Sequence, residues 1–300
     1  MVNDKEAKAP HLYAVDLDGT LLAEDKTYDH AQFDRVMDLL AEQGSYLAIA
    51  TGNQMPKIQQ YMAGHEHHSN LYYIAENGAI IHNQGKDLAL WSFSPELVEQ
   101  TLKALQAHPQ FGLVISCRNG SYVPQERLEP IASLILAQIK AKGIQVPDLD
   151  ESNPLSALRL FYPNAQLLTD RSQLADTVVK LALTSSGQED AYETLAMVQE
   201  ALPEGIVATS SGFGAIDLIL EGHHKGHGLE WLANHLGVPG QQTTAFGDSG
   251  NDLEMFRYAG RALAMANSDP VLLDAASLQI GSHKEGAVLN FIEGELTSAG

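Results

Sequence analysis

Short apolar segments alternate with helical patterns through the first 80 residues of this 300-residue chain. We expect buried strands at residues 12–15, 46–50 and 71–75, because each is a brief apolar run. Between the first two, apolar side chains within 33–40 recur at the spacing of one helix face, and 55–61 is also predicted to be helical. Strand–helix–strand units of this length imply an α/β fold with a parallel sheet and right-handed crossovers.

The same alternation returns near the end of the chain, where a helix is predicted at 229–236, a strand at 243–246 and another helix from 253. The middle of the chain has a different pattern. Its predicted strands lie at 111–117, 178–183, 206–208 and 216–220, and its predicted helices at 95–105, 128–139, 154–161 and 195–202. We therefore predict a doubly wound parallel-sheet core made of 1–83 and 221–300, with an α+β domain inserted at 84–220.

Two carboxylates stand where the first predicted strand ends, in the segment Asp16-Leu17-Asp18-Gly19-Thr20. Acidic residues are poor strand formers, so a pair at the mouth of a buried strand needs an explanation other than folding. If the chain turns at Asp18, the two carboxylates can approach one point from different directions. That arrangement suits a metal ion and a reacting phosphate.

Polar residues also follow the other predicted strands of the core or precede its last helices. They are Thr51, Gly52, residues 76–79, Lys225, Asp248, Asn251 and Asp252. Ligands bind at the carboxyl ends of parallel strands, and converging carboxylates either take up protons or need a cation. Mg²⁺ accepts oxygen ligands and is often held between carboxylates and a phosphate. One carboxylate can then attack phosphorus, while Thr51, Gly52 and Lys225 hold the phosphoryl oxygens.

These segments together resemble the haloacid dehalogenase superfamily, and within it the Cof-type phosphatases. The resemblance is carried by residues 16–22, 50–53, 76–79, 225–226 and 247–255. Residues 211–219 and the stretch ending at Gln54 are similar to bacterial sugar phosphatases of the YbiV (SupH) type. The resemblance spans nearly the whole chain, and it implies a Rossmannoid core with a large inserted cap of the C2 type.

The resemblance also implies a role for each matching residue. Asp16 is expected to be the nucleophile and a Mg²⁺ ligand, and Asp18 the general acid and then the general base, with its backbone carbonyl on the metal. Asp248 is expected to be the other carboxylate ligand, and Asp252 to orient metal-bound water or Lys225. The residues expected to contact the phosphate are Leu17 through its amide, Thr51, Gly52, Lys225 and Asn251.

The implied function is a Mg²⁺-dependent phosphatase that hydrolyses small phosphomonoesters, sugar phosphates in particular, through an aspartyl phosphate. A phosphomutase or phosphotransferase using the same intermediate is an alternative. A receiver-like signalling module is a second one, but it needs neither Asp18 nor an insertion at 84–220. Residues 126–151 look longer than the sugar-phosphatase pattern by about one helix and its loop, which bears on substrate preference.

The bulk composition limits partners and compartment. The formal net charge of −20 argues against nucleic-acid or anionic-membrane binding, and it requires local cations for an anionic substrate. The single cysteine, Cys117, cannot form an internal disulfide, and no segment reaches the roughly 18 apolar residues of a membrane span. Residues 1–6 do not look like a signal peptide. We expect a cytoplasmic monomer or weak homo-oligomer with a phosphorylated small-molecule substrate.

Two groups of histidines invite a second metal hypothesis. They are His65, His67 and His68 in one segment, and His223, His224 and His227 in another. Both segments are polar and offer no soft ligands or strand support, so we favour solvated loops over metal sites.

Overall fold

The computed structural model describes residues 9–298 except 142–145, 147–148, 176, 186–190 and 211–213. Residues 211–213 of the sugar-phosphatase-like segment therefore lie outside the described residues. The chain divides into two compact units. The first comprises residues 1–52, 61–90 and 223–300, and the second comprises 53–60 and 91–222.

The first unit contains an eight-stranded sheet in the order β14-β13-β12-β1-β2-β3-β4-β5. In chain order these strands are β1 (Leu12–Val15), β2 (Tyr46–Ala50), β3 (Leu71–Ala75), β4 (Ile80–Asn83), β5 (Lys86–Leu90), β12 (Thr243–Gly247), β13 (Arg261–Ala264) and β14 (Leu278–Gln279). All neighbours are parallel except the pairs that involve β4 and β5, which are antiparallel.

Strand β1 lies at the centre of this sheet, and its sequence explains why. All four of its residues are buried, as expected for a strand covered on both faces. Leu12 pairs with Thr243 of β12 on one side and with Tyr46 of β2 on the other. Since β12, β1, β2 and β3 are parallel, their carboxyl ends meet at one edge of the sheet, and their polar residues follow there.

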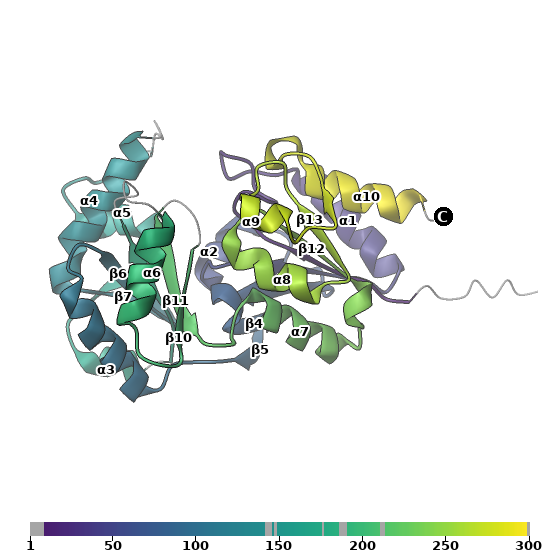
Figure 1. Ribbon diagram of the computed structural model, residues 1–300. Coiled ribbons are helices and arrows are strands. Elements are labelled where there is room, and N and C mark those ends of the chain that lie inside the picture. The colour runs from purple at the N-terminus through teal and green to yellow at the C-terminus, as the bar shows by residue number, and fades with distance from the viewer. Residues whose placement is uncertain are drawn as a thin grey trace, which may run out of the picture. The chain divides into compact units, whose positions relative to one another are not determined.

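Helices cover both faces of the sheet. Helix α1 (His30–Glu42) packs beside α10 (Ala287–Ser298) on one face, and α7 (Lys225–Leu236) packs beside α8 (Leu253–Tyr258) on the other (Figure 1). The apolar positions predicted within 33–40 are the buried face of α1. This is the doubly wound parallel-sheet core predicted from the sequence, and that prediction is confirmed.

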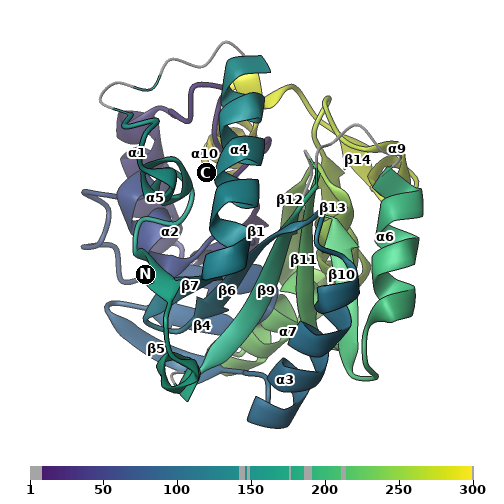
Figure 2. The same ribbon diagram turned by 90° about the vertical axis from the view of Figure 1, so that its left-hand side faces the viewer.

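The second unit contains a six-stranded sheet in the order β10-β11-β9-β6-β7-β8 (Figure 2). Its strands are β6 (Gly112–Cys117), β7 (Gly120–Pro124), β8 (Ala165–Leu168), β9 (Val178–Thr184), β10 (Ile206–Ser210) and β11 (Ala215–Leu220). Its helices are α2 (Met55–Tyr61, whose last residue belongs to the first unit), α3 (Pro95–Ala104), α4 (Gln125–Ala141), α5 (Pro154–Arg159) and α6 (Ala191–Ala201). The pairs are antiparallel except β7 with β8.

Alternate residues of β6 enter different cores of this unit. Leu113 and Ile115 belong to the cluster that includes residues of α3 and α6, whereas Val114 belongs to the cluster of α4 and α5. Successive strand side chains point to opposite faces, so helices cover both faces of the sheet. Ser94 caps α3, because its hydroxyl accepts a hydrogen bond from the amide of Leu97 at 3.1 Å.

The hairpin of β4 and β5 extends the first sheet beyond residue 83, where the sequence suggested no strand. Its turn residues Gln84 and Gly85 both have positive φ, 44° and 76°. A two-residue turn of this kind normally carries Asn-Gly or Asp-Gly, so the Gln-Gly pair did not indicate a hairpin in the sequence.

The limits 84–220 for an inserted domain stay a prediction. Among the described residues, no helix combines the length and the apolar character that crossing a bilayer requires.

Gly228 sets how closely α7 approaches β3 and β4. A Cβ at this position would lie 2.5 Å from Cγ2 of Ile74, whereas a Cβ at Gly294 of α10 meets nothing within 4 Å. We expect Gly228→Ala to lower the free energy of unfolding by about 1–3 kcal/mol through overpacking. Gly294→Ala, the matched control, should raise it by about 0.5–1 kcal/mol. Urea denaturation measures both, and equal effects would contradict the close approach.

Candidate active site at the carboxyl ends of four strands

Four parallel strands of the first unit deliver polar residues to the same edge of the sheet. Asp16 follows β1, Thr51 follows β2, Glu76 opens the short 3-10 helix η1 (Glu76–Gly78) after β3, and Asp248 follows β12. Lys225 is the first residue of α7, which His224 caps by accepting a hydrogen bond from an amide of the first turn. These residues come from distant parts of the sequence, and only the sheet order brings them together.

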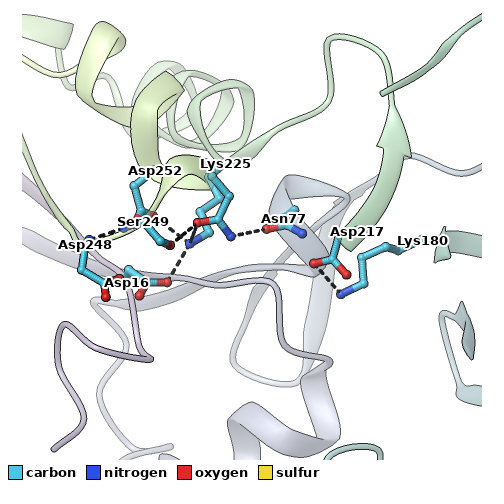
Figure 3. A network of polar contacts seen from close by, with 9 residues as sticks. Asp16, Asn77, Lys180, Asp217, Lys225, Asp248, Ser249 and Asp252 are labelled. Atoms are coloured by element: carbon cyan, nitrogen blue, oxygen red, sulfur yellow. Dashed lines mark hydrogen bonds and ion pairs between the residues drawn. The ribbon is translucent and has the colours of Figure 1, made fainter. Parts of the chain in front are cut away.

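The ammonium group of Lys225 is the centre of the site (Figure 3). Its Nζ lies 2.6 Å from Oδ1 of Asp16, 2.7 Å from Oδ1 of Asp252 and 3.3 Å from Oδ1 of Asn251. Lys225 is only 1% exposed. A buried ammonium is stable only when it is paired and hydrogen-bonded, and this one has three oxygen partners.

Asp252 orders the loop that follows β12. Its second oxygen accepts hydrogen bonds from the amides of Asp248 at 3.0 Å and Ser249 at 3.2 Å. The Ser249 hydroxyl in turn donates to Oδ1 of Asn251 at 2.9 Å. Both carboxylate oxygens of Asp252 are therefore engaged, one by Lys225 and the other by the loop backbone.

The site carries more negative than positive charge, since one ammonium faces three carboxylates. The pKa of the Asp16 carboxyl is raised well above its ordinary value, mainly because the group is buried. The charge of Lys225 opposes this shift, whereas the charges of Asp252 and Asp248 add to it. Burial, followed by the charge of Asp252, raises the pKa of Asp248 to about 7. Burial disfavours the charged form of Lys225, but Asp16 and Asp252 outweigh it and raise its pKa. Carboxylates in this position favour a bound cation or a shared proton.

The residues present fit a divalent metal with oxygen ligands. Asp16, Asp248 and Asp252 each offer an oxygen, and these atoms lie within 4.8 Å of one another. Within the described residues, Oδ1 of Asp248 is buried and has no hydrogen-bond partner, although the other Asp248 oxygen accepts from Asn267 at 3.3 Å. A buried, unsatisfied carboxylate oxygen costs free energy that coordination to a cation recovers. Lys225 and the loop amides already occupy both oxygens of Asp252. The carboxylates best able to hold the metal are therefore Asp16 and Asp248.

Gly19 makes room for Asp248. Its φ is +83°, and a Cβ there would overlap the Asp248 carboxylate. The carbonyl oxygen of Gly19 also accepts a hydrogen bond from Asn267 at 2.9 Å. The glycine after the two aspartates is therefore needed for both its backbone conformation and its missing side chain.

Asp18 is held differently from Asp16. Its carboxylate forms an ion pair with Lys26, and its side chain is 42% exposed. It is not one of the three carboxylates that lie within 4.8 Å of one another. The structure thus leaves Asp18 partly exposed and paired with Lys26, outside the acidic set.

The backbone next to the acidic set is tightly fixed. The Leu17 carbonyl accepts a hydrogen bond from the amide of Leu22 at 2.9 Å. The Thr51 amide donates to Ile74 at 2.9 Å, and Thr51 is buried while Gly52 is partly exposed. The predicted phosphate contacts of Leu17, Thr51, Gly52, Lys225 and Asn251 all remain predictions. The structure shows that Lys225 and Asn251 contact each other.

Asn77 belongs to the segment 76–79, which the sequence placed at a strand end without a role for any single residue. Its side-chain oxygen accepts a hydrogen bond from Nδ2 of Asn251 at 3.1 Å, and its amide donates to the Thr51 carbonyl at 3.0 Å. Asn77 has a φ of 57°, between Glu76 at 51° and Gly78 at 101°. Asparagine tolerates this left-handed region better than most residues, which is the signal in the sequence that points to it.

Comparisons with known proteins match nearly the full length of the chain. A family model of haloacid dehalogenase-like hydrolases matches residues 13–292. The Escherichia coli 5-amino-6-(5-phospho-D-ribitylamino)uracil phosphatase YbjI is 28% identical over 286 residues, 94% of each chain. The HMP-PP phosphatase of Klebsiella pneumoniae is 26% identical over 284 residues, again 94% of each chain. A crystal structure from Streptococcus mutans matches with a TM-score of 0.79 at 28% identity, covering 96% of this chain and 100% of that one.

Replacing Gly19 tests whether Asp248 needs the space beside it. Gly19→Ala and Gly44→Ala both place alanine at positive φ, and each should cost about 1–2 kcal/mol of stability. Only Gly19 has a neighbour to displace, because a Cβ at Gly44 meets nothing within 4 Å. We therefore expect Gly19→Ala alone to weaken Mg²⁺ binding, by about tenfold or more. Thermal unfolding across a Mg²⁺ titration measures both effects, and unchanged Mg²⁺ stabilisation of Gly19→Ala would contradict the assignment.

Proposed function

The chain belongs to the haloacid dehalogenase-like hydrolases, as its motifs predicted, and we propose that it is a Mg²⁺-dependent phosphatase of small phosphomonoesters. One observation carries the proposal. The Asp16 carboxylate lies against the buried ammonium of Lys225 and beside Asp248, which has a buried oxygen without a hydrogen-bond partner among the described residues. This set offers a nucleophile, a fixed cation and a metal ligand at one point.

Asp16 is the group that attacks phosphorus. Its oxygen forms a bond to phosphorus as the bond from phosphorus to the substrate's alcohol oxygen breaks, which gives an aspartyl phosphate and an alkoxide. Asp18 donates a proton to that alkoxide. Asp18 then takes a proton from a water molecule, whose oxygen attacks phosphorus and releases inorganic phosphate and the Asp16 carboxylate.

The groups around Asp16 balance the charge of this reaction. The Lys225 ammonium, 2.6 Å from Asp16, keeps the nucleophile oriented and faces the negative charge that spreads over the phosphoryl oxygens. Asn251, Thr51 and Gly52 and the Leu17 amide complete the proposed phosphate cradle. Asp16, Asp248 and the Asp18 carbonyl would hold Mg²⁺, which lowers the electrostatic cost of bringing a phosphate to an acidic site.

We propose a phosphorylated sugar or sugar alcohol as the substrate class. The Escherichia coli relative is named for a substrate with a phosphorylated ribityl chain. A protein with a formal net charge of −20 repels anions, so a substrate with one phosphate and a neutral polyol suits it better than a polyphosphate or polycarboxylate. Cys117, the single cysteine, is buried, and the proposed setting is the reducing cytoplasm, with the enzyme a monomer or weak homo-oligomer.

Conservative substitutions of the aspartates test the mechanism. Asp16→Asn should abolish Mg²⁺-dependent phosphate release from p-nitrophenyl phosphate, because an amide cannot form the aspartyl phosphate. Asp18→Asn should lower kcat by about 10²–10⁴-fold, the usual contribution of acid–base catalysis. Asp38→Asn, which makes the same change at an exposed position on α1, is the matched control and should keep full activity. Full turnover by Asp16→Asn would overturn the mechanism.

A substrate panel tests the proposed class. Ribitol 5-phosphate, glucose 6-phosphate, phosphoserine, AMP and p-nitrophenyl phosphate are compared by kcat/KM at saturating Mg²⁺. We expect the sugar and sugar-alcohol phosphates to exceed phosphoserine and AMP by about tenfold or more. Equal amounts of free phosphate and alcohol identify a hydrolase, whereas phosphate transferred to an added polyol identifies the transferase alternative. A preference for AMP with aryl phosphate activity intact would refute the substrate class alone.

A further inference from the structure

A second group of metal-binding side chains lies in the first unit, between α1 and the segment that leads into β3. It consists of Asp34 and His30 on α1 and His65, His67 and His68 on the segment. His65 is 2% exposed and His68 is 8% exposed. The expectation of a solvated loop is therefore wrong for these two histidines, because both pack against α1.

Asp34 is the acceptor for two histidine rings. Nδ1 of His65 lies 2.6 Å from Oδ1 of Asp34, and Nε2 of His68 lies 2.9 Å from the same oxygen. Burial would raise the pKa of Asp34, but the hydrogen bonds from His68 and His65 outweigh it and lower that pKa. An ionised Asp34 only accepts, so each of these nitrogens carries a proton.

His65 has no nitrogen left for a further ligand. Its Nε2 lies 2.9 Å from Nδ1 of His30, so both of its ring nitrogens are engaged. This leaves His65 as the residue that orients Asp34, and the hydrogen bond between His30 and His65 holds the His65 ring in place. Carboxylates and imidazoles held in this way commonly hydrogen-bond to the ligands of a metal and orient them.

His67 has one ring nitrogen, Nε2, without a hydrogen-bond partner among the described residues. Its Nδ1 lies 3.1 Å from the carbonyl oxygen of Gly64, which can only accept, so Nδ1 carries the proton. In the neutral ring Nε2 is then the nitrogen with the free lone pair, and no described residue donates a hydrogen bond to it. A backbone carbonyl on Nδ1 is the usual device that leaves Nε2 ready to bind a metal.

One ligand atom from each of Asp34, His67 and His68 lies within 4.8 Å of the other two. Ligands of a tetrahedral Zn²⁺ are separated by about 3.3 Å, given bonds of about 2.0–2.1 Å. The exposed His67 ring can close that difference by rotating its side chain, and the Asp34 side chain is 44% exposed, which gives an ion access. Two imidazoles and one carboxylate favour Zn²⁺ and its neighbours over Mg²⁺.

We propose that Asp34, His67 and His68 form a binding site for a divalent transition metal of the Zn²⁺ class, separate from the candidate active site. His65 and His30 are its positioning residues. On binding, Nε2 of His68 releases its proton to solvent and exchanges its hydrogen bond to Asp34 for the metal, which joins α1 to the segment before β3. The site shares no residue with the acidic set around Lys225, so its loss and the loss of phosphatase activity are distinguishable.

Zinc binding to the full-length protein tests the proposal. Chelator-treated protein is titrated with Zn²⁺ in the presence of excess Mg²⁺, against a chromophoric zinc chelator. His67→Gln removes one ligand at an exposed position, and His235→Gln is the matched control at an exposed histidine of α7. We expect one equivalent of Zn²⁺ on the wild type and on His235→Gln, and an affinity lower by at least about tenfold in His67→Gln.

Two further variants separate this site from the acidic set. Asp34→Asn should also lose the Zn²⁺ equivalent, whereas Asp248→Asn should retain it. Zn²⁺ should raise the thermal unfolding midpoint of the wild type and of Asp248→Asn but not that of His67→Gln. Equal Zn²⁺ affinity of His67→Gln and the wild type, or loss of the equivalent only in Asp248→Asn, would overturn the proposal and leave the histidines as a hydrogen-bonded network alone.

Discussion

The buried ammonium of Lys225 is the interaction on which the rest of the site depends. It contacts Asp16, which lies 209 residues earlier in the chain, and Asp252 at the end of the loop after β12. Without this cation, the carboxylates at the strand ends would repel one another in a region from which water is largely excluded. The first residue of α7 thus links the first and last stretches of the discontinuous first unit, and it orients the proposed nucleophile.

Close approach of the backbone is the second requirement, because the charged groups come from separate strands and loops. A side chain at Gly19 would overlap Asp248, and one at Gly247 would lie 2.6 Å from Cβ of Asp252. Gly228 brings α7 against β3, so that Lys225 reaches the edge of the sheet. The remaining excess of negative charge is what makes the set suited to a divalent cation.

Apolar runs predicted the strands of the core well, and β1, β2 and β3 have the predicted bounds. Buried parallel strands are continuous apolar segments, so their signal is local and strong. The hairpin of β4 and β5 has an unusual Gln-Gly turn, and β5 is partly exposed, so the local pattern did not reveal the hairpin. The contacts of Asn77 with Asn251 and of Lys26 with Asp18 were not predicted for another reason, because residue spacing alone does not show them.

The sequence by itself determined the alternation of strands and helices, the acidic and basic residues at the strand ends, and the family to which they belong. These are properties of short segments, and each segment carries its own pattern. Only the tertiary structure decided that Asp252 contacts Lys225, that Asp18 faces Lys26, and that His65 and His68 are buried against Asp34. Each of these depends on which distant segments the sheet order and helix packing bring within hydrogen-bond distance.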